Sequence, residues 1–432
     1  MNFLKRMKEF FDENKKRIRE KDISICIGNE ACDVDSFISS LVTAFHDSLI
    51  HVICMSREVF MAKGDVGYVL KHFNIDPDDL IYLEKPIGDF STEARKLGTK
   101  FSIYKKDKLV ESYPLKEKNV DLCIVDHNEP IIELQDAKLD LIIDHHALSK
   151  GSVKARRIYI DLDVGSCSTL ISKYIGHSLI MNTANKTDDF EDSEITQNIA
   201  KLLLVPIILD TSNFKRRASH FDVGEFEKLL RQSNVTRKEM KQIRKGIRKH
   251  RLNDADQPND IIMQKDFKIY HHRGLTFGCA TVKYPAEEWV DREGRGKDAG
   301  VYLEAYFNTF RRNFGLDFLF INRKKGDKRY LIINNCSFES VLAKENNFKP
   351  IEYKGLHYYE IDVKKSRKVM MPIVIETINR FYKNMKKREE EKEKRLKEGI
   401  SVHELQKELK REKKTVIQQE NTSSDDSSDY IK

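Results

Sequence analysis

The chain has 432 residues, of which 40% are hydrophobic and 34% charged, with a formal net charge of +8. This length allows two or more domains, and the positive charge favours polyanionic partners. Because no apolar run could span a bilayer, no leader pattern is visible and the seven cysteines form no C-x-x-C pair, we expect a cytosolic protein without membrane contact.

The first part of the chain alternates strand-like apolar runs with helical patterns. An amphipathic helix is expected over residues 1–21, and further helices over 36–49, 170–175 and 195–204. Strands are expected over 23–27, 51–55, 122–125, 141–143 and 205–209. This alternation predicts an α/β fold with a mostly parallel, doubly wound sheet.

A basic stretch separates this region from a second one. Residues 237–251 carry five basic side chains near one face of a predicted helix, and this face could guide a long polyanion; they are Arg237, Lys241, Arg244, Arg248 and Arg251. We predict a first domain at 1–235, a basic linker at 236–258, a smaller α/β domain at 259–385 and a charged, disordered tail at 386–432. In the smaller domain, strands are expected over 261–270, 276–282, 316–322, 330–333 and 357–361, and a closing helix over 371–382.

Four of the strand-like runs end in acidic, amide or imidazole side chains. In chain order these are Asn29, Asp33 and Asp35, then Asp126 and Asn128, then Asp144, His145 and His146, and finally Asp210. Each motif alone could be a turn, a helix cap or a loop. Because open α/β sheets bind ligands at the carboxyl ends of their strands, the four together predict one crevice. Its clustered acids would repel without cations, and oxygen ligands with one imidazole suit two Mg²⁺ or Mn²⁺ ions better than Zn²⁺.

At these residues the sequence resembles the DHH phosphoesterase superfamily. Asp144-His145-His146 is the motif that names the superfamily, and the runs beginning at Asp33, Val125 and Asp210 resemble its other acidic motifs in the expected order. The first motif is most similar to the eukaryotic exopolyphosphatase and prune branch. Ser366-Arg367-Lys368, followed by Pro372, resembles the substrate-binding signature of a second domain called DHHA2.

The resemblance implies an active site in the cleft between the DHH and DHHA2 domains. One ion would be held by Asp33, Asp126 and Asp210 with Asn29 nearby, and the other by Asp35, Asp126, His145 and Asp210. His146 would face the phosphate under attack and act with Asp126 and Asp210 in catalysis, while Asn128 would lie behind the ligands. The residues expected to contact phosphate are Arg367 and Lys368, with Lys241 as a further candidate.

We therefore predict a metal-dependent exopolyphosphatase that releases orthophosphate from the ends of linear polyphosphate. Alternatives are a pyrophosphatase like those of family II and a prune-like enzyme that cleaves short polyphosphates or nucleotides. An alternative of another class is an interaction scaffold that uses the charged tail. Family II pyrophosphatases carry His where Asn29 stands, and the Gly-Gly-Gly-His signature of the nuclease branch is absent, so no specific nucleic acid is expected. The oligomeric state is left open.

Overall fold

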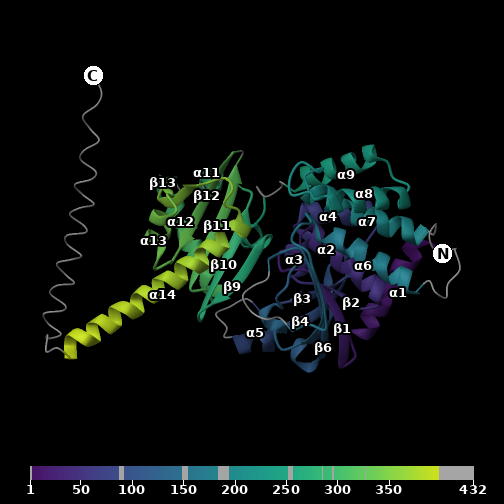
Figure 1. The fold of residues 1–432 in the computed structure, drawn as a ribbon, viewed down its shortest axis with the longest axis horizontal. Coiled ribbons are helices and arrows are strands. Elements are labelled where there is room, and N and C mark those ends of the chain that lie inside the picture. The colour runs from purple at the N-terminus through teal and green to yellow at the C-terminus, as the bar shows by residue number, and fades with distance from the viewer. Residues whose placement is uncertain are drawn as a thin grey trace, which may run out of the picture. The chain divides into compact units, whose positions relative to one another are not determined.

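The computed structural model describes residues 2–86, 92–147, 154–182, 194–251, 256–284, 286–293, 296–325 and 327–397. These residues form two sheets with helices packed around them (Figure 1). The chain divides into two compact units, Met1–Cys336 with Phe348–Arg367, and Ser337–Asn347 with Lys368–Lys432. Both sheets lie in the first unit, which confirms the predicted α/β class with a large sheet and a second one. The domain boundaries drawn from the sequence stay a prediction.

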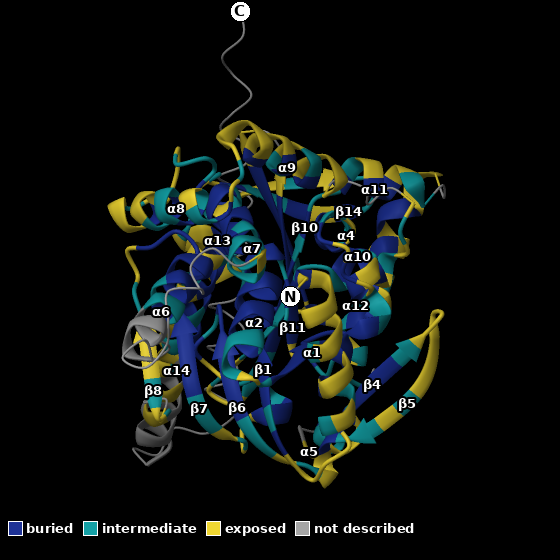
Figure 2. Cartoon of the chain, turned by 90° about the vertical axis from the view of Figure 1, so that its right-hand side faces the viewer, coloured by how far each residue is buried: buried dark blue, intermediate teal, exposed yellow. Residues whose placement is uncertain are grey.

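The first sheet has eight strands in the order β5-β4-β3-β2-β1-β6-β7-β8. Strands β3, β2, β1, β6, β7 and β8 run parallel, and β4 and β5 add an antiparallel edge, where β5 is largely exposed (Figure 2). Neighbours of β1 are β2 on one side and β6 on the other, so the strand order reverses there, and such a reversal opens a ligand crevice. The strands are β1 (Asp22–Ile27), β2 (Ile50–Ile53), β3 (Ile81–Glu84), β4 (Lys100–Lys105), β5 (Lys108–Pro114), β6 (Asn119–Val125), β7 (Lys138–Asp144) and β8 (Arg157–Ile160).

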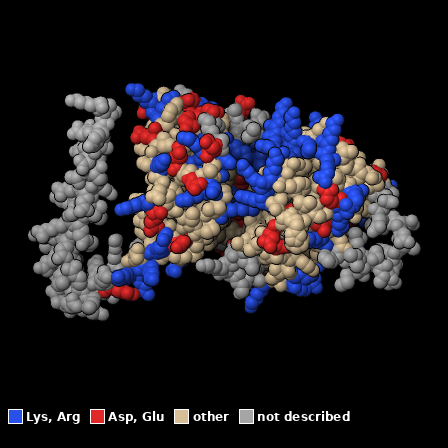
Figure 3. All heavy atoms as spheres, turned by 45° about the horizontal axis from the view of Figure 1, so that its top comes forward, with Lys and Arg blue, Asp and Glu red and all other residues tan. Residues whose placement is uncertain are grey.

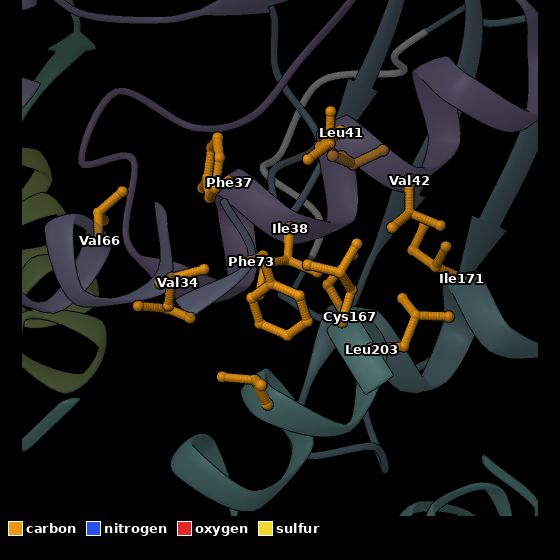
Figure 4. Close-up of a cluster of buried hydrophobic side chains, with 14 of the residues drawn as sticks. Val34, Phe37, Ile38, Leu41, Val42, Val66, Phe73, Cys167, Ile171 and Leu203 are labelled. Carbon is orange, nitrogen blue, oxygen red and sulfur yellow. The ribbon is translucent and has the colours of Figure 1, made fainter. Parts of the chain in front are cut away.

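Helices of this part of the chain bury their apolar side chains against the sheet. Along β1, Cys26 joins one hydrophobic cluster while Ile25 and Ile27 join another, because alternate side chains of a strand face opposite sides. The cluster of Figure 4 is built from α2, α4, α6, α7 and the residue after α4; its labelled members are Val34, Phe37, Ile38, Leu41, Val42, Val66, Phe73, Cys167, Ile171 and Leu203. The helices are α1 (Phe3–Arg17), α2 (Val34–Asp47), α3 (Arg57–Met61), α4 (Gly64–His72), α5 (Thr92–Gly98), α6 (Cys167–Asn182), α7 (Glu194–Asp210), α8 (His220–Gln232) and α9 (Arg237–His250).

The strand predicted over residues 205–209 is wrong. Helix α7 runs without a break to Asp210 and contains Pro206. Every residue from Leu202 to Ile208 is buried, so this segment is apolar on all sides. A short apolar run does not distinguish a buried helix from a buried strand, and Asp210 therefore ends a helix.

The second sheet has six strands in the order β13-β14-β12-β11-β10-β9, and of its strand pairs β10 with β11 is parallel. Four of its predicted strands are confirmed, but the one over 261–270 is half wrong, since α10 occupies its first part. Strand β13 was not predicted, because its exposed, Pro-containing segment has little apolar patterning. The elements are α10 (Asn259–Gln264), β9 (Phe267–His272), β10 (Leu275–Val282), α11 (Ala286–Arg292), α12 (Ala299–Asn313), β11 (Phe318–Lys325), β12 (Lys328–Asn334), β13 (Lys349–Tyr353) and β14 (Leu356–Ile361).

The second unit contains α13 (Glu339–Glu345) and nearly all of α14 (Arg367–Lys397). The rings of Phe338 and Phe381 lie 5.8 Å apart, and Arg380 pairs with Glu345 at 2.7 Å. Helix α14 includes the predicted closing helix and extends beyond it. The tail after Lys397 lies outside the described residues. Within the part of the chain that the structure describes, no helix is both long and apolar enough to cross a membrane.

All seven cysteines are buried free thiols. Cys26 of β1 stands in register beside Cys123 of β6, and burial raises the pKa of Cys26 well above its ordinary value. Five of the thiols belong to the region of the first sheet, Cys279 lies inside β10, and Cys336 follows β12. Thiols in such surroundings pack as small apolar groups.

Candidate metal centre

Asp126 follows the last residue of β6 and lies at the centre of the predicted site. Its backbone adopts φ of 61°, a left-handed conformation that Asp tolerates, and its N–H donates to the carbonyl of Ile143 at 3.0 Å. The carboxylate lies 3.3 Å from Nε2 of His145 and 3.8 Å from Nδ1 of His146. Burial would raise the pKa of Asp126, but the two imidazoles lower it well below its ordinary value. The carboxylate is therefore ionised and available to a cation at neutral pH.

Hydrogen bonds at Nδ1 orient the two imidazoles of the Asp-His-His motif. Nδ1 of His145 lies 3.1 Å from the carbonyl of Val164 and donates to it, which orients the ring with Nε2 on the side of Asp126, where a metal ion would bind. Nδ1 of His146 lies 2.7 Å from Asp144. Ligand atoms of Asp126, His145 and His146 all lie within 4.8 Å of one another, which is the spacing of a metal site.

Asp144 supports this motif from within the protein. Its side chain is fully buried and accepts hydrogen bonds from the backbone N–H of His145 at 2.8 Å and from the amide of Asn128 at 2.6 Å. The amide of Asn128 also lies 3.3 Å from the carbonyl of His146. Asn128 thus links Asp144 to the backbone that carries the motif, and its role in the site stays a prediction.

Asn29 contacts the centre through Asp126. Its amide donates to Oδ2 of Asp126 at 2.6 Å, while its own Oδ1 accepts the backbone N–H groups of Ala31 and Cys32 at 2.9 and 3.2 Å. The turn passes close to α2, where a Cβ on Gly28 would lie 2.2 Å from Oγ of Ser36, so only glycine fits there. In this arrangement Asn29 offers the centre an N–H donor.

Asp35 is fixed by the first turn of α6. Its Oδ2 accepts the N–H of Cys167 at 2.7 Å, and its Oδ1 accepts Oγ of Ser166 at 3.0 Å and both N–H and Oγ of Ser168 at 3.0 and 2.9 Å. Burial and the nearby Asp126 raise the pKa of Asp35 above its ordinary value. A helix N-terminus holds a carboxylate well, so this side chain is pre-oriented.

Asp33 and Asp210 complete the predicted acids. Asp33 caps α2 by accepting the N–H of Ser36 at 3.1 Å. Asp210 ends α7, and although the residue keeps exposed surface, the protein partly removes water from its carboxylate. This desolvation, followed by repulsion from Asp35, Asp33 and Asp126, raises the pKa of Asp210 well above its ordinary value. The predicted acids are thus close enough to act on one another electrostatically, and a divalent cation would relieve this repulsion.

The donor set fits divalent ions. Carboxylate oxygens with an imidazole nitrogen are ligands that Mg²⁺ and Mn²⁺ accept. The residues would be Asp33, Asp35, Asp126, His145 and Asp210, of which Asp126 and His145 lie 3.3 Å apart.

Basic side chains near the centre include one that the sequence did not single out. Lys268 of β9 has its pKa lowered by burial and by Arg367, while Asp126 and Asp33 act in the opposite direction, so it lies within their electrostatic reach. Arg367 pairs with Asp266 at 2.7 Å. No local sequence signal marks Lys268, because its electrostatic interaction with Asp126 and Asp33 arises only in the fold.

Two other predicted phosphate contacts, Lys241 and Lys368, have exposed side chains. Lys241 is exposed on α9, whose buried residues are Met240, Ile243 and Ile247. Lys368 belongs to the second unit, where it is exposed. Their roles stay predictions.

Comparison with known families agrees with this geometry. The model of the DHH family N-terminal domain matches residues 23–207, and that of the DHHA2 domain matches residues 230–377. Together they span more than half of the chain, which belongs to the DHH superfamily, whose members are metal-dependent phosphoesterases. The recognition made from the sequence is confirmed, including its prune-like branch.

Individual relatives are distant. The "Exopolyphosphatase PRUNE1" of Rattus norvegicus is 21% identical over 442 residues, covering 95% of this chain and 87% of that protein. A "Putative exopolyphosphatase" of Schizosaccharomyces pombe is 26% identical over 296 residues, covering 63% and 66%. The crystal structure of a "putative family II inorganic pyrophosphatase" of Methanococcus jannaschii has a TM-score of 0.55 at 20% identity, covering 83% of this chain and 99% of that one. The last likeness concerns the fold.

Proposed function

We propose that this DHH hydrolase is an exopolyphosphatase that removes the terminal phosphate from linear polyphosphate, with two Mg²⁺ or Mn²⁺ ions. The observation that carries the proposal is the convergence of Asp126, His145 and His146 at the carboxyl edge of the parallel strands. Names of the distant relatives support the substrate class. The basic side chains Lys268 and Arg367 supply charge that suits a phosphate chain.

Each group of the chain has a distinct task in this reaction. When bound, the ions polarise the phosphoryl group and activate water for in-line attack. Asp126 and His145 would hold the cations, and Asp35 is kept in a fixed orientation by the first turn of α6. His146, oriented by Asp144, faces the reacting phosphate and can donate a hydrogen bond to it. Lys268 and Arg367 neutralise charge on the non-reacting oxygens.

A phosphate-release assay tests the proposal. Long polyphosphate, tripolyphosphate, pyrophosphate and a cyclic nucleotide are compared, each with Mg²⁺ and with Mn²⁺. We expect the highest kcat/KM for a linear polyphosphate. A clear preference for pyrophosphate would instead identify a pyrophosphatase, and preference for the nucleotide would identify a phosphodiesterase.

The contribution of Arg367 is measured with a matched control. Arg367→Ala should raise KM for tripolyphosphate, roughly tenfold for one lost charge-assisted hydrogen bond. Arg380→Ala removes an arginine of the same helix with an equally short ion pair, 2.7 Å to Glu345, and should leave KM unchanged. Equal effects of the two variants would mean that Arg367 only supports the fold.

A further inference from the structure

A small hollow, partly open to solvent, adjoins the metal centre. Asp33, one of the predicted ligands, forms part of its lining, together with residues of α4, α10 and β10. Charged side chains dominate the lining, notably Lys63, Asp65, Arg251, Asp266 and Lys283. Seven of its ten lining residues are charged, which suits a polar or charged occupant.

Of the three acids in the lining, Asp65 and Asp266 are already paired with cations, while Asp33 is the predicted metal ligand. Asp65 pairs with Arg251 at 3.0 Å, and Asp266 pairs with Arg367 at 2.7 Å. Lys63 donates to the carbonyl of Lys265 at 2.6 Å. Positive charge therefore remains in the hollow after its acids are counted.

Lys283 is the cation of the lining that takes part in none of these contacts. It follows the last residue of β10, and no carboxylate among the described residues lies within ion-pair distance of its ammonium. Burial, followed by repulsion from Arg251, lowers the pKa of Lys283 to about 7. An enclosed amine beside other cations is stabilised in its charged form by an anion.

We propose that this hollow is the subsite for the third and later phosphate groups, counted from the end that is cleaved, with Lys283 as their principal contact. The inference rests on the proposed function and deepens it, because such a subsite makes the enzyme select chains of three or more phosphates. A pyrophosphate held at the metals would leave this subsite empty. The hollow would thus make the enzyme prefer polyphosphate to pyrophosphate as its substrate.

Continuity of charge supports a chain-like ligand. Arg251, in the lining, directly follows α9, and the exposed side of this helix carries Lys238, Lys241, Lys245, Arg248 and Lys249. Figure 3 shows Lys and Arg side chains gathered on the face of the molecule that carries α9. A compact anion would need only the hollow, whereas a long polyanion can use both.

Binding of non-hydrolysable analogues to the full chain with Mg²⁺ tests the subsite. Calorimetric titration compares a methylene-bridged triphosphate with a methylene-bridged diphosphate on wild type, Lys283→Met and Lys283→Arg. The matched control is Lys324→Met, an exposed lysine of β11 outside the hollow. Lys283→Met should weaken binding of the triphosphate by about tenfold or more. Binding of the diphosphate should stay within about twofold, and Lys283→Arg should restore the triphosphate affinity.

The outcomes separate this inference from the proposed function. If wild type releases phosphate from polyphosphate but Lys283→Met binds both analogues as wild type does, the subsite is overturned and the enzyme activity stands. Equal weakening for both analogues also overturns it. If no phosphate is released from any substrate but the triphosphate still binds through Lys283, the subsite stands and the activity is overturned. Thermal unfolding of each variant shows that the fold is retained, and Lys63→Met provides a second test if Lys283→Met does not fold.

Discussion

Removal of the Asp222 carboxylate should cost far more stability than its place in a helix cap suggests. Asp222 is fully buried and forms a capping box with Ser219 at the start of α8. The same carboxylate also accepts the N–H of Gly165 at 2.9 Å and Oγ of Thr169 at 2.6 Å, both from the segment that begins α6. It therefore joins two helices of the first unit.

The size of the effect follows from these bonds. Loss of a cap costs about 1 kcal/mol, and each hydrogen bond to a buried charged acceptor adds about 1.5 kcal/mol. Asp222→Ala should thus lower the free energy of unfolding by about 4 kcal/mol. Glu239→Ala is a matched control, because Glu239 forms the same capping box with Thr236 in α9 but is exposed. Its loss should be much smaller.

Urea unfolding of wild type and both variants provides the measurement, read at the first transition. A second readout is the rise of the melting temperature on adding Mn²⁺, which should shrink for Asp222→Ala alone, since α6 holds Asp35. If the two variants lost equal stability, the link between α8 and α6 would carry no energy. If Mn²⁺ raised the melting temperature of Asp222→Ala as much as that of wild type, the Asp222 carboxylate would not support the metal centre.

Three further predictions concern the site and its surroundings. Asp126→Asn keeps the left-handed backbone and should reduce phosphate release by roughly a hundredfold or more, together with the stabilisation by Mn²⁺; a folded variant with near-normal turnover would exclude the two-metal centre. Asn29→His should strengthen activation by Mn²⁺ and weaken that by Mg²⁺, and coinciding metal titrations would show that this position does not influence the metals. Although burial alone would raise it, Arg367 lowers the pKa of Asp266 to about 2, so its stabilising contribution is present above about pH 4 and is lost as pH falls through 2. Unfolding curves of wild type and Asp266→Asn should therefore converge over that range, and a constant difference would contradict the assignment.

Sequence patterns predicted those parts of the site that depend on local order. Asp126 and His145 follow apolar runs that are strands, and strand ends of a parallel sheet meet at one edge. The helical setting of Asp210 could not be seen, because a segment buried on every side carries no period. Lys268 was missed because a single lysine in a strand is typical of the protein surface. Only the fold brings it within electrostatic reach of Asp126. Long-range contacts of this kind have no local signature.

The buried thiols make the protein its own reporter of conformational opening. Because every cysteine is enclosed in the fold, a thiol reagent added to the native protein should react only after local or global opening. The rate of labelling then measures how often each region opens. Labelling of Cys279 reports on the second sheet, while Cys26 and Cys123 report on the centre of the first. Mass spectrometry of partly labelled protein would thus rank the two sheets by their opening rates without any introduced probe.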